Sequence, residues 1–222
     1  MEQDNSSAFN KIKLHRFVFF TDAVLAIILT LLVIELHLPE LINSNSSGEM
    51  IEKLWYMAPH FASFLLCFLQ LASAWLGFNL MDSLIKTYDN TLGILRLMML
   101  LPLSLMPFAS SLIGNYFFNP VSFAFFGFIG IWTSIIQVNT LKYLWKKEMY
   151  VDELDRQHFK DKVLKRVWIF PIVSTFLMGV AFINTYIAFA IYLVMNLIGI
   201  VSMRWLKFTK TQELISVNNT GS

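Results

Sequence analysis

Two acidic residues interrupt an apolar stretch of membrane length near the start of the chain. Residues 16–38 read R-F-V-F-F-T-D-A-V-L-A-I-I-L-T-L-L-V-I-E-L-H-L, with Asp22 near one end and Glu35 near the other. Acids inside a membrane span usually face protein or water, where they mark an ion pathway or a structural network. The charge-free residues between them would rise only about 18 Å as a helix, less than the roughly 30 Å of hydrocarbon. We therefore expect an inner helix that other helices shield from lipid.

One stripe of this helix offers a candidate pore wall. Ile27, Thr30, Leu31 and Ile34 recur at i, i+3, i+4 and i+7, which places them on one face. Any span rich in Ile and Leu presents such a stripe for packing, and periodicity alone favours packing over pore lining. The short charge-free core favours pore lining, because such a helix needs protection from lipid.

The polar residues before the stripe form a second candidate site. Arg16, Phe20, Thr21 and Asp22 could make a cation-binding mouth or a structural network, and we favour the network because a buried carboxylate needs partners. Six residues separate Arg16 from Asp22, about 600° of turn and ~9 Å of rise, so the two are poorly placed to pair. We expect donors from the second span instead, with the candidates Trp75 and Asn79.

Other clusters carry weaker chemistry. His37 and His60 fall at the outer ends of the first two spans, as a bis-His haem pair might, but we interpret them as interfacial polar residues. A charge-dense segment mixes acids and His158 with basic residues, which is typical of a solvated helix face rather than a metal site. We find no phosphate loop, metalloprotease or nucleophile-elbow motif, and we predict neither an enzyme nor a cofactor.

The composition places these residues in a polytopic membrane protein. The chain has 222 residues, of which 56% are hydrophobic and 14% charged. Its mean hydropathy is +0.59, and soluble domains usually carry about 25% charged residues. The net charge of +2 gives no reason to expect nucleic acid as a partner. The single Cys67 excludes a disulfide framework.

Hydropathy and turn residues divide the chain into one six-span domain, residues 1–222. The expected spans are 14–38, 53–81, 91–114, 120–143, 167–183 and 186–203, with a hydrophilic connector at 144–166. Sixteen of the seventeen Lys and Arg residues fall on the side of the two termini, and Lys53 alone falls on the other. Because basic residues concentrate on the cytoplasmic side, we predict an all-α membrane protein with both termini in the cytoplasm.

The first span and two later segments resemble a known family. R-x-x-x-F-T-D at residues 16–22 is similar to the signature R-x-x-x-F-S-D of the transmembrane protein 175 family, potassium-permeable channels of prokaryotes and of animal endosomes and lysosomes. Residues 105–116, L-M-P-F-A-S-S-L-I-G-N-Y, are similar to its P-F-x-x-x-L-x-G-x-Y segment, and Trp75 matches a family Trp. The similarity covers about residues 15–118, whereas spans four to six agree only in number and length.

The resemblance implies roles for the first helix. In the family, this helix from each of four subunits lines the pore, so helix 1 would be innermost around a central pore. The matched apolar constriction is Ile27, the matched hydroxyl is Thr30, and Leu31 and Ile34 form further apolar layers.

Two departures put the polar network around Asp22 in question. Phe78 and Asn79 stand where the family has paired histidines, and Arg96 stands where it has an Asn early in span three. We therefore expect a rewired network, with Arg96 as a counter-ion for Asp22.

Together these observations predict a homotetrameric, potassium-selective or weakly selective cation channel, multi-pass in the cell membrane. Its partners would be potassium ions, the lipid bilayer and copies of itself. The alternative is a small proton-coupled secondary transporter that uses Asp22 or Glu35.

Overall fold

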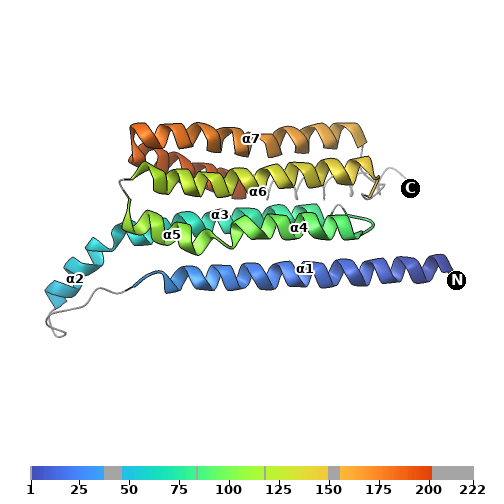
Figure 1. The fold of residues 1–222 in the computed structure, drawn as a ribbon, viewed down its shortest axis with the longest axis horizontal. Coiled ribbons are helices and arrows are strands. Elements are labelled where there is room, and N and C mark those ends of the chain that lie inside the picture. The colour runs from blue at the N-terminus through green and yellow to red at the C-terminus, as the bar shows by residue number, and fades with distance from the viewer. Residues whose placement is uncertain (1, 38–46, 84, 118, 150–155, 202–222) are drawn as a thin grey trace, which may run out of the picture.

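Helices that run side by side make up the molecule, with one short helix turned away from the rest (Figure 1). The computed structural model describes residues 2–37, 47–83, 85–117, 119–149 and 156–201. The elements are α1 (Glu2–Ile34), α2 (Ser47–Tyr56), α3 (Ala58–Asp82), α4 (Asn90–Leu103), α5 (Met106–Asn115), α6 (Pro120–Lys146) and α7 (Arg156–Ile183). A last helix covers Thr185–Val201. The predicted all-α membrane fold is confirmed.

Local signals in the sequence set the helix boundaries. The Asp89 carboxylate accepts a hydrogen bond from the Leu92 N–H at 2.8 Å and so begins α4. Asn119 caps α6 in the same way through the Val121 N–H at 2.9 Å, and proline follows directly in the first turn. Asn184 caps the last helix. These side chains satisfy backbone donors that a helix start leaves unpaired.

Apolar helices occupy all six predicted span positions. Among the residues that the structure describes, four helical segments are long enough to cross a membrane: Leu14–Ile34, Ala58–Asp82, Asn90–Asn115 (α4 with α5) and Pro120–Lys146. Two are shorter, Val167–Ile183 and Thr185–Val201. The count of six spans and the cytoplasmic side of the termini remain predictions.

Three boundaries differ from the predicted ones. The helix around the predicted start of the second span begins earlier, at Ser47, and bends at Met57, which separates α2 from α3. The third consists of two helices, α4 and α5, with Pro102 and Pro107 on either side of the break. The predicted connector is partly helical, since α6 continues to Lys146 and α7 begins at Arg156.

Within one chain, α1 is an edge helix. It lies beside α3, α4 and α5, on the side of the bundle opposite α7 (Figure 1). Only 22% of its apolar window is buried, against 39% to 50% for the other long apolar helices. A single chain therefore shields α1 only in part. That α1 lies innermost around a central pore stays a prediction about several copies of the chain together.

The other side of the bundle depends on a close approach of three helices at Gly127. A Cβ placed on Gly127 of α6 would lie 2.5 Å from the Tyr192 hydroxyl and 2.7 Å from Cγ of Met178. Tyr192 is held there, because it is buried and its hydroxyl donates to the Ser174 carbonyl at 3.1 Å. Glycine thus lets α6, α7 and the last helix meet.

This contact predicts opposite effects for two glycine substitutions. Gly127→Ala should lower the stability of the fold by about 1–3 kcal/mol, because the added methyl group overpacks a filled site. Gly179→Ala on α7 meets nothing within 4 Å and should stabilise its helix by about 0.5–1 kcal/mol. Thermal unfolding of both variants in one detergent measures the difference, and equal melting temperatures would contradict the packing described.

Candidate functional site: the first helix and its polar contacts

The face of α1 that packs on the bundle repeats every three to four residues. Thr21, Leu25, Ile28 and Leu32 are exposed by only 0–4%, at i, i+4, i+7 and i+11. Leu25, Ile28 and Leu32 belong to the core of the bundle. This row fixes the rotation of α1 about its own axis, because a turn of about 100° would replace each of these side chains with a neighbour.

The predicted stripe lies on the opposite side of α1. Ile27 is 59% exposed, Leu31 41% and Ile34 65%, and Thr30 is exposed as well. We call these four residues the free face of α1. Exposed apolar side chains on one helix face are suited to meeting lipid or further protein, and here they lie on the helix with the smallest buried share among the four long apolar segments.

Thr30 supplies the only side-chain oxygen of the free face. Its hydroxyl donates to the Ile27 carbonyl at 2.8 Å, as is common for Thr in helices. Because this bond uses the hydroxyl proton, the oxygen keeps lone pairs that can accept or coordinate. The free face therefore presents three apolar side chains and one acceptor.

Asp22 is tied to the neighbouring helix. The indole N–H of Trp75 on α3 donates to the Asp22 carboxylate at 3.0 Å. Asp22 is half-buried, while Thr21 beside it is buried and donates to the Phe17 carbonyl. A hydrogen bond to a charged group is worth about 1.5–3 kcal/mol, so this contact anchors α1 to α3.

Arg96 pairs with a different acid from the expected one. Its guanidinium forms an ion pair with Asp82 at the end of α3, and the two side chains are exposed by only 7% and 14%. The guanidinium also lies over the Phe78 ring, 4.7 Å from its centroid. Phe78 and Arg96, the two positions at which we expected a rewired network, are thus in contact with each other.

The remaining predicted residues do not join this network. Arg16 is exposed and Phe20 is 49% exposed. Asn79 is half-buried, and no hydrogen bond joins it to Asp22 among the residues that the structure describes.

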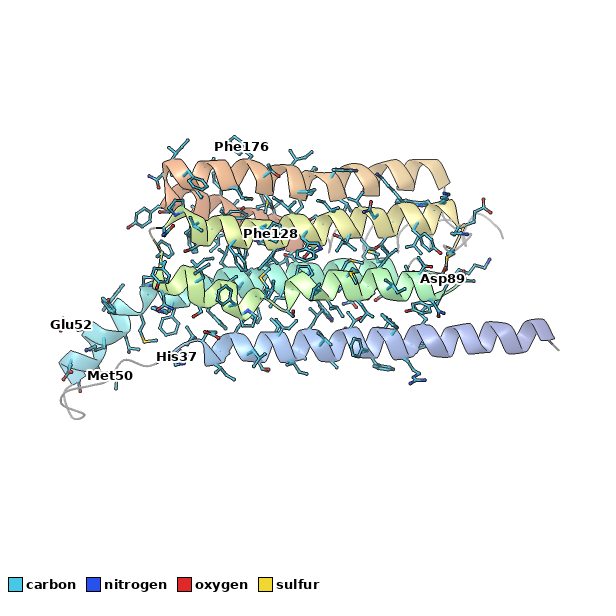
Figure 2. The ribbon with its side chains drawn as sticks, in the orientation of Figure 1. His37, Met50, Glu52, Asp89, Phe128 and Phe176 are labelled. Carbon is cyan, nitrogen blue, oxygen red and sulfur yellow. The ribbon has the colours of Figure 1, made fainter. Side chains whose placement is uncertain are left out.

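Sequence reasoning missed two residues that link α4 to α6. The Tyr143 hydroxyl of α6 donates to the Asp89 carboxylate, which also caps α4. Asp89 lies at the end of the bundle opposite α2 (Figure 2). Its place before a helix is a capping signal that could have pointed to it. In the connection between α3 and α4, burial raises the pKa of the neighbouring Tyr88 hydroxyl to about 12.

The two outer histidines each have local partners. His60 contacts the Asn115 amide oxygen through Nε2 at 3.4 Å, and His37 is exposed with Nδ1 3.2 Å from the Glu35 carbonyl. Within the described part of the chain, no group of three or more potential metal ligands comes together.

The Asp22 anchor makes a first prediction for this site. Trp75→Phe keeps the ring and removes the donor, so it should lower stability by about 1–2 kcal/mol. Arg16→Gln at an exposed position should stay within about 0.5 kcal/mol of the parent. Thermal unfolding of the purified protein measures both. If Trp75→Phe instead melts like the parent and changes ion preference, Asp22 belongs to the cation pathway and not to an anchor.

The Arg96–Asp82 pair predicts strong coupling. Arg96→Met leaves Asp82 buried without its counter-ion and should cost about 3–5 kcal/mol, as should Asp82→Leu alone. The double variant removes both charges and should recover most of that loss. A double-mutant cycle on melting temperature measures the coupling, and additive losses would exclude a direct pair.

Comparison with known proteins finds sequence similarity to one family. The family model described as "Endosomal/lysosomal potassium channel TMEM175" matches residues 16–107. The rat protein named as an endosomal/lysosomal proton channel TMEM175 is 28% identical over 102 residues, which are 46% of this chain and 20% of the rat protein. The chain thus matches only a fifth of the length of that mammalian relative.

Two bacterial relatives match over most of their length. A Chryseobacterium protein named as a potassium channel is 28% identical over 82% of this chain and 90% of its own. A protein from Chamaesiphon minutus, also named as a potassium channel, is 25% identical over 79% of this chain and 88% of its own length.

A solved structure shares the fold. The crystal structure of a lysosomal potassium-selective channel TMEM175 homologue from Chamaesiphon minutus superposes with a TM-score of 0.75. It has 19% identity and covers 86% of this chain and 98% of its own. The family match, the bacterial relatives and the shared fold confirm the resemblance visible in the sequence: this chain is similar to the TMEM175 family over residues 16–107 and shares the fold of a bacterial homologue.

Proposed function

We propose that this protein is a passive cation channel whose pore is lined by α1 from four copies of the chain. The observation that carries the proposal is the division of α1 into two faces. Ile28 on the packed face is 4% exposed, whereas the residue before it, Ile27 on the free face, is 59% exposed. The names of the bacterial relatives support potassium as the conducted ion.

The number of copies follows from the single lining helix. Each chain contributes one α1 at its edge, and one helix cannot enclose a pore. Four copies around a common axis would bring four free faces together and would shield the charge-free residues 23–34 from lipid. Four is also the number that the family resemblance implies for a chain with one set of six spans.

The ring of Ile27 would act as a hydrophobic constriction. Four isoleucine side chains offer no oxygen ligands, so they can gate by dewetting, and an ion that passes must keep or briefly shed part of its water. Shedding water penalises Na⁺ more than K⁺, which gives a modest K⁺ preference. Thr30, about one turn along the helix, would offer four oxygens to the partly dehydrated ion.

The alternative, a proton-coupled transporter, would need Asp22 or Glu35 to take up and release protons during transport. The bond from Trp75 supports a structural role for Asp22. A channel would show unitary currents without a fixed exchange stoichiometry. We place the channel in the cell membrane with both termini in the cytoplasm, from the distribution of basic residues.

Substitutions in the free face test the pore. Ile27→Asn puts four amides where there were methyl groups, so it should raise K⁺ current and bring Na⁺ flux up with it. Ile27→Val keeps the ring apolar and should leave selectivity close to the parent. Thr30→Val should lower K⁺ preference while the constriction stays apolar. Planar-bilayer recording of purified protein in asymmetric KCl, with Na⁺ replacement, measures all three.

Controls on other faces of α1 separate pore effects from general damage. Val33 is also exposed, at 55%, but lies about 120° around the helix from Ile27, so Val33→Asn should leave selectivity unchanged. Ile28→Val on the packed face should do the same. If Val33 or Ile28 variants alter permeation while Ile27 variants do not, the pore face is assigned wrongly. A monomer in native mass spectrometry that still conducts would refute the four-copy pore.

A further inference from the structure

The short helix α2 exposes every one of its apolar side chains. None of its residues is buried, and within the chain it packs mainly against α3. Trp55 is 76% exposed and Ile51 58%. Such exposure on a helix of only ten residues calls for a partner outside the single chain.

The apolar residues of α2 form one continuous stripe. At 100° per residue four of them fall within an arc of about 140°, namely Met50, Ile51, Leu54 and Trp55, and Tyr56 lies outside this arc. The charged residues occupy the other side of the helix, and they are Glu49, Glu52 and Lys53. We call the four apolar residues the α2 stripe. An amphipathic helix of this kind docks through its apolar side.

The direction of α2 is fixed by its joint with α3. Met57 is buried, and its N–H donates to the carbonyls of Lys53 and Leu54, both at 3.1 Å. Its own carbonyl accepts from the N–H groups of His60 and Phe61. Hydrogen bonds therefore continue through the bend, and α2 is held at an angle to the bundle.

This angle carries α2 toward the α1 side of the molecule. Figure 1 shows α2 leaving the end of the bundle where α1 ends and extending past α1, away from α6 and α7. Met50 and Glu52 lie at its far part in Figure 2, whereas Phe176 lies on the opposite side of the bundle, on α7. Phe176 is 68% exposed, as expected for a side chain that meets lipid.

We propose that α2 is an arm that crosses to a second copy of this chain and packs its apolar stripe on the end of that copy. The inference rests on the proposed function, because an assembly around α1 puts the α1 side of each chain against its neighbours. At this end each chain exposes further apolar side chains outside the free face for the stripe to cover: Val33 at 55% and Phe61 at 45%. The arm would thus continue the contact between copies that begins along α1.

A lipid surface is the competing occupant. Trp55 and Tyr56 are residue types that gather at membrane interfaces, and a short amphipathic helix can lie among headgroups. In the proposed assembly, however, lipid lies on the side of α7, and α2 points the other way. The geometry therefore favours protein.

Site-specific photocrosslinking tests the arm. A benzophenone amino acid replaces Ile51, Trp55 or, as the matched control on the charged side, Glu52 in otherwise intact protein in liposomes. Irradiation should give crosslinked dimers on a denaturing gel from positions 51 and 55 and few or none from position 52. In addition, the double variant Ile51→Ala/Trp55→Ala should weaken the association of subunits by about tenfold or more, since it truncates a central aromatic contact.

Native mass spectrometry of the same samples separates the outcomes. A tetramer that crosslinks only to lipid, or to nothing, from positions 51 and 55 overturns the arm and leaves the pore proposal standing. Equal dimer yields from positions 51, 52 and 55 also overturn it, because the stripe would then not select the partner. A protein that is monomeric throughout overturns the arm and the four-copy pore together.

Discussion

The packing of Thr21, Leu25, Ile28 and Leu32 against the bundle decides what α1 can do. In a helix of 3.6 residues per turn, burying this row necessarily turns Ile27, Leu31 and Ile34 outward. The bond from Trp75 to Asp22 works in the same sense, because a directional contact to one carboxylate also resists rotation of the helix. Apolar packing and one hydrogen bond thus set the rotation of α1 together.

Much of this arrangement could be predicted from the sequence. The helical class follows from an apolar composition, since a lipid environment requires every backbone polar group to be paired within the segment. The stripe follows from spacing alone. Trp75 can be predicted as a donor for Asp22, because a carboxylate within a span needs a donor and a tryptophan on the next span can supply one.

The parts that could not be predicted depend on choices between near-equal partners. Asp22 and Asp82 are both acids near Arg96, and only the position of the end of α3 beside α4 decides that Arg96 pairs with Asp82. Pro59 lies in the first turn of α3, where proline is tolerated. A proline at this place does not show whether the residues before it belong to the same helix or to a separate one. The break at Met57, and with it the separate existence of α2, was therefore not visible in the sequence.

Polar contacts join several helices of the bundle, but in the part of the chain that the structure describes α1 takes part in them only through Asp22. Asp22 joins α1 to α3, Asp82 joins α3 to α4, and Asp89 joins α4 to α6, so three carboxylates link four helices in succession. Toward Ile34 the described contacts of α1 with the bundle are apolar, through Ile28 and Leu32. Hydrogen bonds and ion pairs hold a geometry strictly, whereas apolar packing is non-directional and tolerates small shifts. One end of α1 is thus held in a fixed place, and the end that carries the free face is held by burial, which four copies of the chain would increase.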